Sequence, residues 1–275
     1  MTGADAAAVV DGHVHVACPD EARFPRHPTG VGSDWWTTDG SVDQLRANLL
    51  GNGVDRAVIV QSTGLYAFDC RCAAAVVAAE PQRFALVSTL DMDADDPAAA
   101  VEGHAAAGAV AVRAASASPD APTWLTDGRG AAVWAAAARL GLGVVALVRT
   151  PHLDALGSLC RQAPEVPVVL DHCGMPALDG PTADDAVLRA AEIPTLHVKV
   201  TSLNLAGADD AGWLRRLVDT YGSHRCCWGS DYPQHRTHTY AEMRALVEAA
   251  SSGLDQHERH DLLAATSLRL WWPAS

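Results

Sequence analysis

Residues 130–148 read GAAVWAAAARLGLGVVALV and hold one complete helix-to-strand unit. The stretch Gly130–Leu140 is rich in alanine and leucine, residues of high helix propensity. Gly141 and Gly143 form a typical helix stop, because glycine readily adopts the left-handed conformation that ends a helix. The β-branched run Gly143–Val148 then predicts a strand. A helix that leads directly into a strand is typical of α/β proteins.

The same unit recurs along the whole chain. We expect eight strands, at Ala8–Val16, Asp55–Ser62, Arg83–Leu90, Ala109–Ala115, Gly143–Val148, Val166–His172, Thr195–Ser202 and Arg225–Asp231. The predicted helices are Ser41–Leu50, Asp69–Ala79, Pro97–Ala107, Gly130–Leu140, Leu153–Gln162, Asp184–Glu192, Asp210–Tyr221, Tyr240–Ala250 and Gln256–Trp272. Eight units of about 34 residues each favour a closed (β/α)8 TIM barrel over a doubly wound sheet, which rarely needs eight even units.

Two features are added to the barrel pattern. No break in composition divides the chain, so we expect a single barrel domain over residues 1–275. The irregular segment Ala17–Gly40, which carries Trp35 and Trp36, is a long loop after the first strand. It would lie at the carboxyl face of the barrel, where barrel active sites are built. The helix Gln256–Trp272 is an extra C-terminal element.

Composition excludes several classes of protein. The chain has 20 basic and 33 acidic residues, a net charge of −13, which argues against partners such as nucleic acid or an anionic membrane surface. Seven cysteines are too few for a disulfide scaffold, so we expect them to be reduced in a cytoplasmic protein. The most apolar stretch, Ala131–Val148, contains Arg139 and two glycines, and the first ten residues lack signal-peptide features. We therefore expect neither a membrane span nor a leader.

Histidines mark the end of the first predicted strand. Asp11, His13 and His15 are two residues apart, so in a regular strand they share one face. Two imidazoles placed in this way can ligate one metal ion or hold one substrate oxygen. The alternative is a chance pair of packed histidines, but the position at the end of a barrel strand favours function.

Two more chemical groups come at the ends of later strands. His172 ends the sixth strand and shares its parity with Val168 and Leu170, and Asp231 ends the eighth strand in the run CCWGSDYP. Read alone, His172 could cap a Gly–Pro turn and Asp231 could cap the next turn. Together with the first-strand pair they indicate a catalytic site at the carboxyl ends of strands one, six and eight.

These motifs resemble the amidohydrolase superfamily, in the branch that holds 2-pyrone-4,6-dicarboxylate lactonase and L-fuconolactonase. The matching stretches are DGHVHV, QLRANLLGNGVDRAVIVQ, the run from HLDAL through VVLDHCGMP, HVKVTS and HRCCWGSDYP. The resemblance implies an active site of His13, His15, His172 and Asp231. It also implies that Asp231 is the general base that activates water.

The sequence departs from the two-metal members of this superfamily. Those members supply a bridging Lys or Glu from strand four and a His from strand five, whereas here the two strands read AVAVRA and GVVALV. His152 comes after strand five and is expected to cap or pack there. We therefore expect at most one divalent ion, with zinc favoured, or none. His13, His15 and Asp231 would be its ligands, and His172 would be a fourth ligand or would polarise the substrate.

Cationic side chains at the same face favour a carboxylated substrate. They are Arg113, Arg149, Lys199 and Arg236. Charge-assisted hydrogen bonds from such a cluster suit a carboxylate. Lys199 would point into the barrel, because Val198 and Val200 on the other face of its strand would meet the helices. The alternative is that each cation pairs with one of the many acidic residues of the chain.

We expect the chain to be a hydrolase that opens a small-molecule lactone, carrying a carboxylate or derived from a sugar acid. A non-oxidative decarboxylase on the same scaffold is the first alternative, although that branch needs a firmly held metal and a strand-five His. A barrel that binds a small acid without catalysis is the second alternative, and the cluster of three histidines and Asp231 counts against it.

Overall fold

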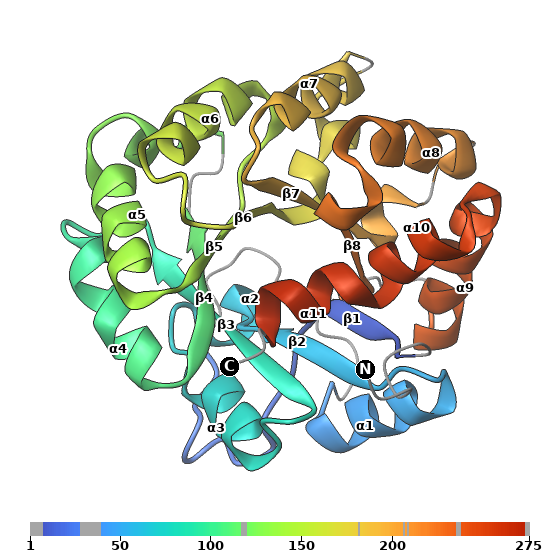
Figure 1. The fold of residues 1–275 in the computed structure, drawn as a ribbon. Coiled ribbons are helices and arrows are strands. Elements are labelled where there is room, and N and C mark those ends of the chain that lie inside the picture. Colours follow the sequence, from blue (N-terminus) through green and yellow to red (C-terminus); the bar gives the residue numbers. More distant parts are fainter. Residues whose placement is uncertain are drawn as a thin grey trace.

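Eight parallel strands form one continuous sheet in the computed structural model, which describes residues 8–27, 40–116, 120–180, 182–205, 207, 209–234 and 238–272. The strands are β1 Val10–Val14, β2 Arg56–Val60, β3 Phe84–Asp91, β4 Ala109–Ala115, β5 Gly143–Ala146, β6 Val168–Leu170, β7 Leu196–Thr201 and β8 Cys226–Gly229. Each pairs with the next in sequence order, and Figure 1 shows helices around the outside of the ring. The predicted (β/α)8 TIM barrel is confirmed.

Helices connect the strands on the outside of the barrel. They are α1 Val42–Gly51, α2 Thr63–Tyr66, α3 Arg71–Ala79, α4 Val101–Ala106, α5 Arg129–Leu140, α6 Leu153–Gln162, α7 Ala183–Arg189, α8 Asp210–Tyr221 and α9 Tyr240–Ala250. The predicted C-terminal helix is present as α10 Gln256–His260, a π-helical turn at Asp261–Ala265 and α11 Thr266–Trp271. No helix in the described part of the chain is both long and apolar enough to cross a membrane.

The core has two layers. Residues such as Ile59, Leu86 and Val198 face outward and pack between the strands and the helices. A smaller cluster fills the barrel interior and includes Val87, Val169 and Cys227, together with Val58, Val60, Ala85, Ala111, Val145 and Trp271. Because Trp271 belongs to α11, this helix closes the amino-terminal end of the barrel (Figure 1). The carboxyl end of the barrel is not covered by α11, and this is the end at which barrel enzymes build their active sites.

Two glycines let β8 approach β1. A Cβ atom on Gly229 would lie 2.5 Å from the Cβ of His13, and a Cβ on Gly12 would lie 2.6 Å from the carbonyl oxygen of Trp228. Both distances are shorter than real contacts allow. The closure continues past the strand ends, where the Asp231 N–H donates to His13 O at 2.9 Å and the His15 N–H donates to Tyr232 O at 2.7 Å.

The prediction that Asp11, His13 and His15 share one face of a strand is wrong, because β1 contains a one-residue bulge. Asp11 pairs with Ala57 and Val14 pairs with Ile59, so three steps along β1 match two steps along β2. The extra residue reverses the side-chain alternation. Asp11 therefore faces the helices, where it accepts a hydrogen bond from the Tyr240 hydroxyl of α9 at 2.9 Å.

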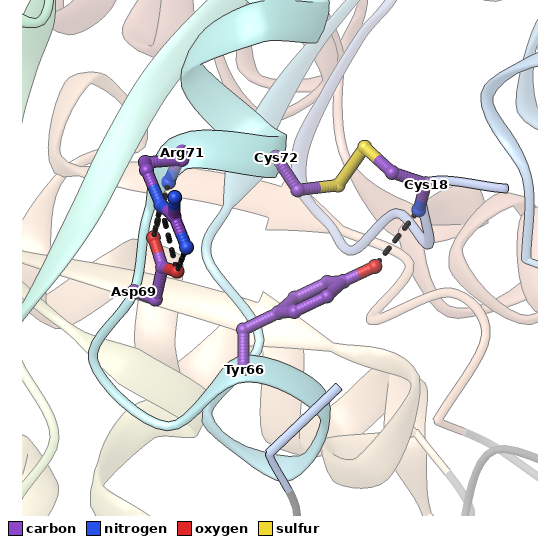
Figure 2. Close-up of a disulfide and its surroundings, with 5 residues drawn as sticks. All are labelled: Cys18, Tyr66, Asp69, Arg71 and Cys72. Carbon is purple, nitrogen blue, oxygen red and sulfur yellow. Dashed lines mark hydrogen bonds and ion pairs between the residues drawn. A yellow bond between two sulfur atoms is a disulfide. The ribbon is translucent and has the colours of Figure 1, made fainter. Parts of the chain in front are cut away.

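A disulfide between Cys18 and Cys72 overturns the expectation that all cysteines are reduced (Figure 2). The chain after β1 contacts α3 through this disulfide and α2 through a hydrogen bond, in which the Cys18 N–H donates to the Tyr66 hydroxyl at 2.9 Å. The two Cα atoms lie 5.9 Å apart, within the range that a disulfide spans. Their separation of 54 residues hides this proximity in the sequence. The other five cysteines are free thiols.

Candidate active site

Three histidines and one aspartate meet at the carboxyl end of the barrel. His13 lies in β1, His15 follows β1, His172 follows β6 and Asp231 follows β8, and all four are buried. The Nε2 atoms of His13 and His15 lie 3.2 Å apart. Asp231 Oδ1 lies 3.5 Å from the first of these atoms and 3.4 Å from the second. The structure thus brings together the four residues expected from the sequence.

The backbone around Asp231 sets the direction of its carboxylate. Asp231 has a φ of 63°, a left-handed conformation that aspartate tolerates better than most residues. Its N–H donates to His13 O, and its carbonyl accepts from Gln234 N at 2.8 Å. These bonds hold the turn after β8 against β1, so the carboxylate lies beside the imidazoles of His13 and His15.

The second ring nitrogen of His15 is held by the neighbouring strand. His15 Nδ1 lies 2.7 Å from the carbonyl oxygen of Val60 at the end of β2. A carbonyl only accepts hydrogen bonds, so Nδ1 carries the proton and Nε2 presents its lone pair to the site. This is the usual support for a histidine that binds a metal ion.

His172 reaches the site by a route that strand parity does not predict. Val168 and Leu170 face the helices, so a regular strand would turn His172 outward with them. Instead, the chain leaves the strand in a 3-10 turn, and His172 and Cys173 have φ values of 52° and 51°. Such strained conformations persist where the surroundings hold them, often at functional sites. The turn places His172 within 4.8 Å of the ligand atoms of His13 and Asp231.

Asp171 takes the inward position at the end of β6, and sequence reasoning gave it no role. Its carboxylate is fully buried, accepts from Lys199 Nζ at 2.8 Å and from Arg113 Nε at 2.6 Å, and lies 3.5 Å from His13 Nδ1. Burial alone would raise the pKa of Asp171, but Lys199 and Arg113 outweigh it and hold the pKa well below 3.8. The sequence pattern that could have identified Asp171 is its position two residues after Val169, which puts both on the face of the strand that points into the barrel interior.

Electrostatics leave neutral imidazoles around a charged carboxylate. Burial and the charge of Lys199 hold the pKa of His13 well below 6.5, and burial also lowers the pKa of His172. Burial acts to raise the pKa of Asp231, but the imidazoles of His172, His15 and His13 outweigh it, and this pKa lies below 3.8. At neutral pH the cluster therefore offers nitrogen lone pairs and an anionic oxygen, which are the donors of a divalent metal site.

The geometry also fits one metal ion. Ligands held about 2.0–2.1 Å from a zinc ion at tetrahedral corners lie about 3.3 Å from one another. The triangle of His13 Nε2, His15 Nε2 and Asp231 Oδ1 has edges of 3.2, 3.4 and 3.5 Å. His172 forms a second possible ligand group with His13 and Asp231, in which the ligand atoms all lie within 4.8 Å of one another.

The predicted cations divide into different environments. Arg113 is buried and points into the barrel, and only its Nε is hydrogen-bonded among the described residues. Lys199 points inward as expected but has no exposed surface and is paired with Asp171. Arg149 is bound by the carboxylates of Asp120 and Asp179. All three fit the alternative of pairing with acidic residues, since Arg113 also pairs with Asp171 through its Nε. Arg236, Trp35 and Trp36 lie outside the described residues.

Eight parallel strands in sequence order, with a cluster of histidines and an aspartate at their carboxyl ends, are the arrangement of a barrel enzyme, because barrel enzymes build their sites at this end. The sequence profile of the Amidohydrolase family matches residues 10–271. The chain therefore belongs to the amidohydrolase family, and the resemblance drawn from its motifs is confirmed.

The proteins that this chain resembles include a lactonase and a hydrolase. The chain is 29% identical over 100 residues to L-fucono-1,5-lactonase of Burkholderia ambifaria. This match covers 33% of the chain and spans about a third of the relative, 34% of its length. The probable 2-pyrone-4,6-dicarboxylic acid hydrolase of Acinetobacter baumannii, crystallised with citric acid, has a TM-score of 0.72 at 17% identity. That comparison covers 95% of this chain and 98% of the other.

Two further structures share the fold. An amidohydrolase from Burkholderia multivorans with bound zinc has a TM-score of 0.76 at 22% identity, over 96% of this chain and 99% of that one. The 2,6-dihydroxybenzoate decarboxylase from Rhizobium has a TM-score of 0.68 at 14% identity, over 96% and 98% of the two chains. The fold is thus similar to that of both a hydrolase and a decarboxylase.

Proposed function

We propose that this protein opens a carboxylated lactone by hydrolysis, with Asp231 as the general base. The observation that carries the proposal is the position of the Asp231 carboxylate, 3.4 and 3.5 Å from two imidazole nitrogens at the carboxyl end of the barrel. A general base must lie within hydrogen-bond reach of the water it activates, and this end of the barrel is where barrel enzymes bind substrate.

The reaction balances with water as the only co-reactant. A carboxylate oxygen of Asp231 accepts a proton from water, and the water oxygen forms a bond to the lactone carbonyl carbon. The ring C–O bond then breaks, and Asp231 returns its proton to the departing oxygen. The product is an open-chain hydroxy acid, and Asp231 is regenerated as a carboxylate.

One divalent ion, with zinc favoured, fits the triangle of His13, His15 and Asp231. When bound, it would polarise the lactone carbonyl and lower the pKa of water at the site. His172 faces the same space, either as a fourth ligand or as a group that polarises the substrate. The position of the His172 proton decides between these two roles.

Arg113 is our candidate for the residue that binds the substrate carboxylate. Its Nε is bonded to Asp171, whereas its terminal amino groups have no hydrogen-bond partner among the described residues. The net charge of −13 repels an anion at long range, so capture must be local. Lys199 and Asp171 would act behind Arg113 by holding its guanidinium in place.

Product analysis tests this function. Purified protein is incubated with a set of carboxylated lactones while acid release and CO2 are both measured. We expect acid release without CO2. Release of CO2 from hydroxybenzoates would instead establish the decarboxylase alternative, and neither product across a broad set would favour a binding protein without catalysis.

A further inference from the structure

A chain of hydrogen bonds begins at the Nδ1 atom of His172, and the hydrolytic mechanism above makes no use of it. His172 Nδ1 lies 2.9 Å from the Thr201 hydroxyl oxygen at the end of β7. That oxygen lies 3.2 Å from Asn204 Oδ1, in the 3-10 turn Ser202–Asn204 that follows β7. Thr201 is fully buried, and Asn204 is half-buried.

Two backbone groups fix the orientation of the Asn204 amide. The Thr201 N–H donates to Asn204 Oδ1 at 3.0 Å, and Asn204 Nδ2 donates to the His172 carbonyl at 2.9 Å. A flipped amide would place a donor against an N–H and an acceptor against a carbonyl, which would lose both bonds. The oxygen of the amide therefore faces Thr201.

This orientation determines where the Thr201 hydroxyl proton goes. Asn204 Oδ1 has no hydrogen to give, so Thr201 must donate in the 3.2 Å contact between the two oxygens. The Asn204 backbone N–H also donates to the Thr201 hydroxyl, as part of a capping box. One lone pair of the hydroxyl remains, and it faces His172 Nδ1. His172 completes the arrangement by donating a proton from Nδ1.

We infer that Asn204, through the Thr201 hydroxyl, holds His172 in the tautomer protonated at Nδ1, so that Nε2 presents a lone pair toward His13 and Asp231. Asn204 is then a positioning residue, and it acts twice, since its Nδ2 also holds the carbonyl of the left-handed His172. In the opposite tautomer the Thr201 hydroxyl would donate to Nδ1, and the side-chain oxygens of Thr201 and Asn204 would lie 3.2 Å apart with no proton between them, which is costly.

The tautomer decides the role of His172 within the proposed function, on which this part of the inference rests. A neutral imidazole with a lone pair at Nε2 can bind a metal ion or accept a proton. It cannot donate a hydrogen bond from Nε2 to a developing oxyanion. His172 is therefore assigned as a ligand or acceptor, and oxyanion stabilisation is left to other groups of the site.

Nitrogen NMR of the full-length protein tests the tautomer directly. The protein is labelled with ¹⁵N-histidine and dialysed against a chelator, so that no metal dictates the tautomer. Long-range ¹H–¹⁵N correlation spectra at neutral pH then report which ring nitrogen carries the proton, with His172→Gln used for assignment. We expect the Nδ1–H pattern for His172. The Nε2–H pattern in the wild-type protein would overturn the inference, whatever the variants do.

Matched variants test the relay, by which we mean the hydrogen bonds from Asn204 through the Thr201 hydroxyl to His172 Nδ1. Thr201→Ser keeps the hydroxyl and should keep the Nδ1–H pattern, whereas Thr201→Val removes it and should give a mixture of tautomers. Asn204→Leu should do the same, because the hydroxyl is then free to donate to Nδ1. Zinc affinity, measured by competition with a chelating dye, should fall at least tenfold in Thr201→Val and recover in Thr201→Ser. An unchanged tautomer in both Thr201→Val and Asn204→Leu would overturn the relay.

The two proposals fail separately. If the Nδ1–H tautomer is found but no lactone is opened, the relay stands and the proposed function falls. If lactone opening is found with His172 protonated at Nε2, the function stands and the relay falls.

Discussion

The Asp171 carboxylate joins three side chains of the site. Its carboxylate contacts Arg113, Lys199 and the Nδ1 side of His13. Two cations and one buried anion give this group a net positive charge directly beneath the candidate ligands. A buried charge network of this kind is costly unless every member is paired, and Asp171 pairs both cations. We infer that its task is to hold Arg113 and His13 in fixed directions.

Arg113→Met tests whether the substrate carries a carboxylate. The substitution keeps much of the packing of the side chain and removes the charge. We expect KM for a carboxylated lactone to rise about tenfold, since a hydrogen bond to a charged group contributes roughly 1.5–3 kcal/mol. KM for the methyl ester of the same lactone should change far less.

Arg149→Met is the matched control for that measurement. Arg149 is bound by Asp120 and Asp179, so its loss should lower the stability of the fold. It should change KM for the acid and KM for the methyl ester to the same extent. If Arg113→Met affects acid and ester substrates equally, Arg113 is structural and the carboxylated substrate loses its main support.

At the scale of elements, the disulfide ties the chain after β1 to α3 (Figure 2). Cys18 comes three residues after His15, so this link anchors the segment that leaves the active site. Replacing both Cys18 and Cys72 by serine should lower the free energy of unfolding by up to about 4 kcal/mol, because the closed loop is long. Denaturant titration with and without dithiothreitol measures the loss.

Cys70→Ser is the control for the disulfide, since Cys70 lies two residues from Cys72 but is a free thiol. In Cys70→Ser, dithiothreitol should lower the free energy of unfolding by as much as it does in the wild-type protein. Thiol titration of the denatured, unreduced chain should count five thiols. A count of seven would show that the link between Cys18 and Cys72 does not form.

The contact between α8 and α10 predicts a pH dependence of stability. Arg215 donates to both oxygens of Glu258, at 2.6 and 2.7 Å, and with the Asp255 N–H it lowers the pKa of Glu258 from 4.5 to about 2. A carboxyl whose pKa is depressed in the folded state stabilises it above pH 4.5 and loses this effect as the pH falls toward 2.

Glu258→Gln should therefore destabilise the protein at pH 7 by about 1 kcal/mol, and the difference from the wild-type protein should shrink below pH 4. Urea midpoints measured between pH 3 and pH 7 report this directly. The exposed Glu165→Gln is the control and should show no such trend. A difference that stays constant across the whole range would contradict the assignment.

The regular parts of the molecule were predictable from sequence, and the departures from regularity were not. Eight β-branched runs between alanine-rich helices specify the barrel, since each run has the length and spacing of one unit. The strand-end position of His13, His15 and Asp231 follows from the same pattern. The bulge in β1 and the left-handed turn at His172 reverse the expected faces, and no local pattern marks either one. The Cys18–Cys72 link depends on a contact across 54 residues.

For the whole molecule, the described part of the barrel has one candidate metal site. The inward residues of β4 include Ala111 and Arg113, and β5 contributes only apolar side chains, so among the described residues neither strand supplies a second set of ligands. Elemental analysis of the native protein should therefore find no more than one equivalent of a tightly bound divalent ion. Two stoichiometric ions would mean that residues outside this cluster complete a second site.

The rate of lactone opening by Asp231→Asn tests the central claim, that Asp231 and the three histidines form a hydrolytic site. The substitution keeps the shape of the side chain and removes the base. We predict that kcat falls about 100-fold or more, while thermal unfolding shows an intact fold. Asp261→Asn, which alters a buried carboxylate that binds Arg269 in the C-terminal helix, should retain kcat. Near wild-type turnover in Asp231→Asn would contradict the claim.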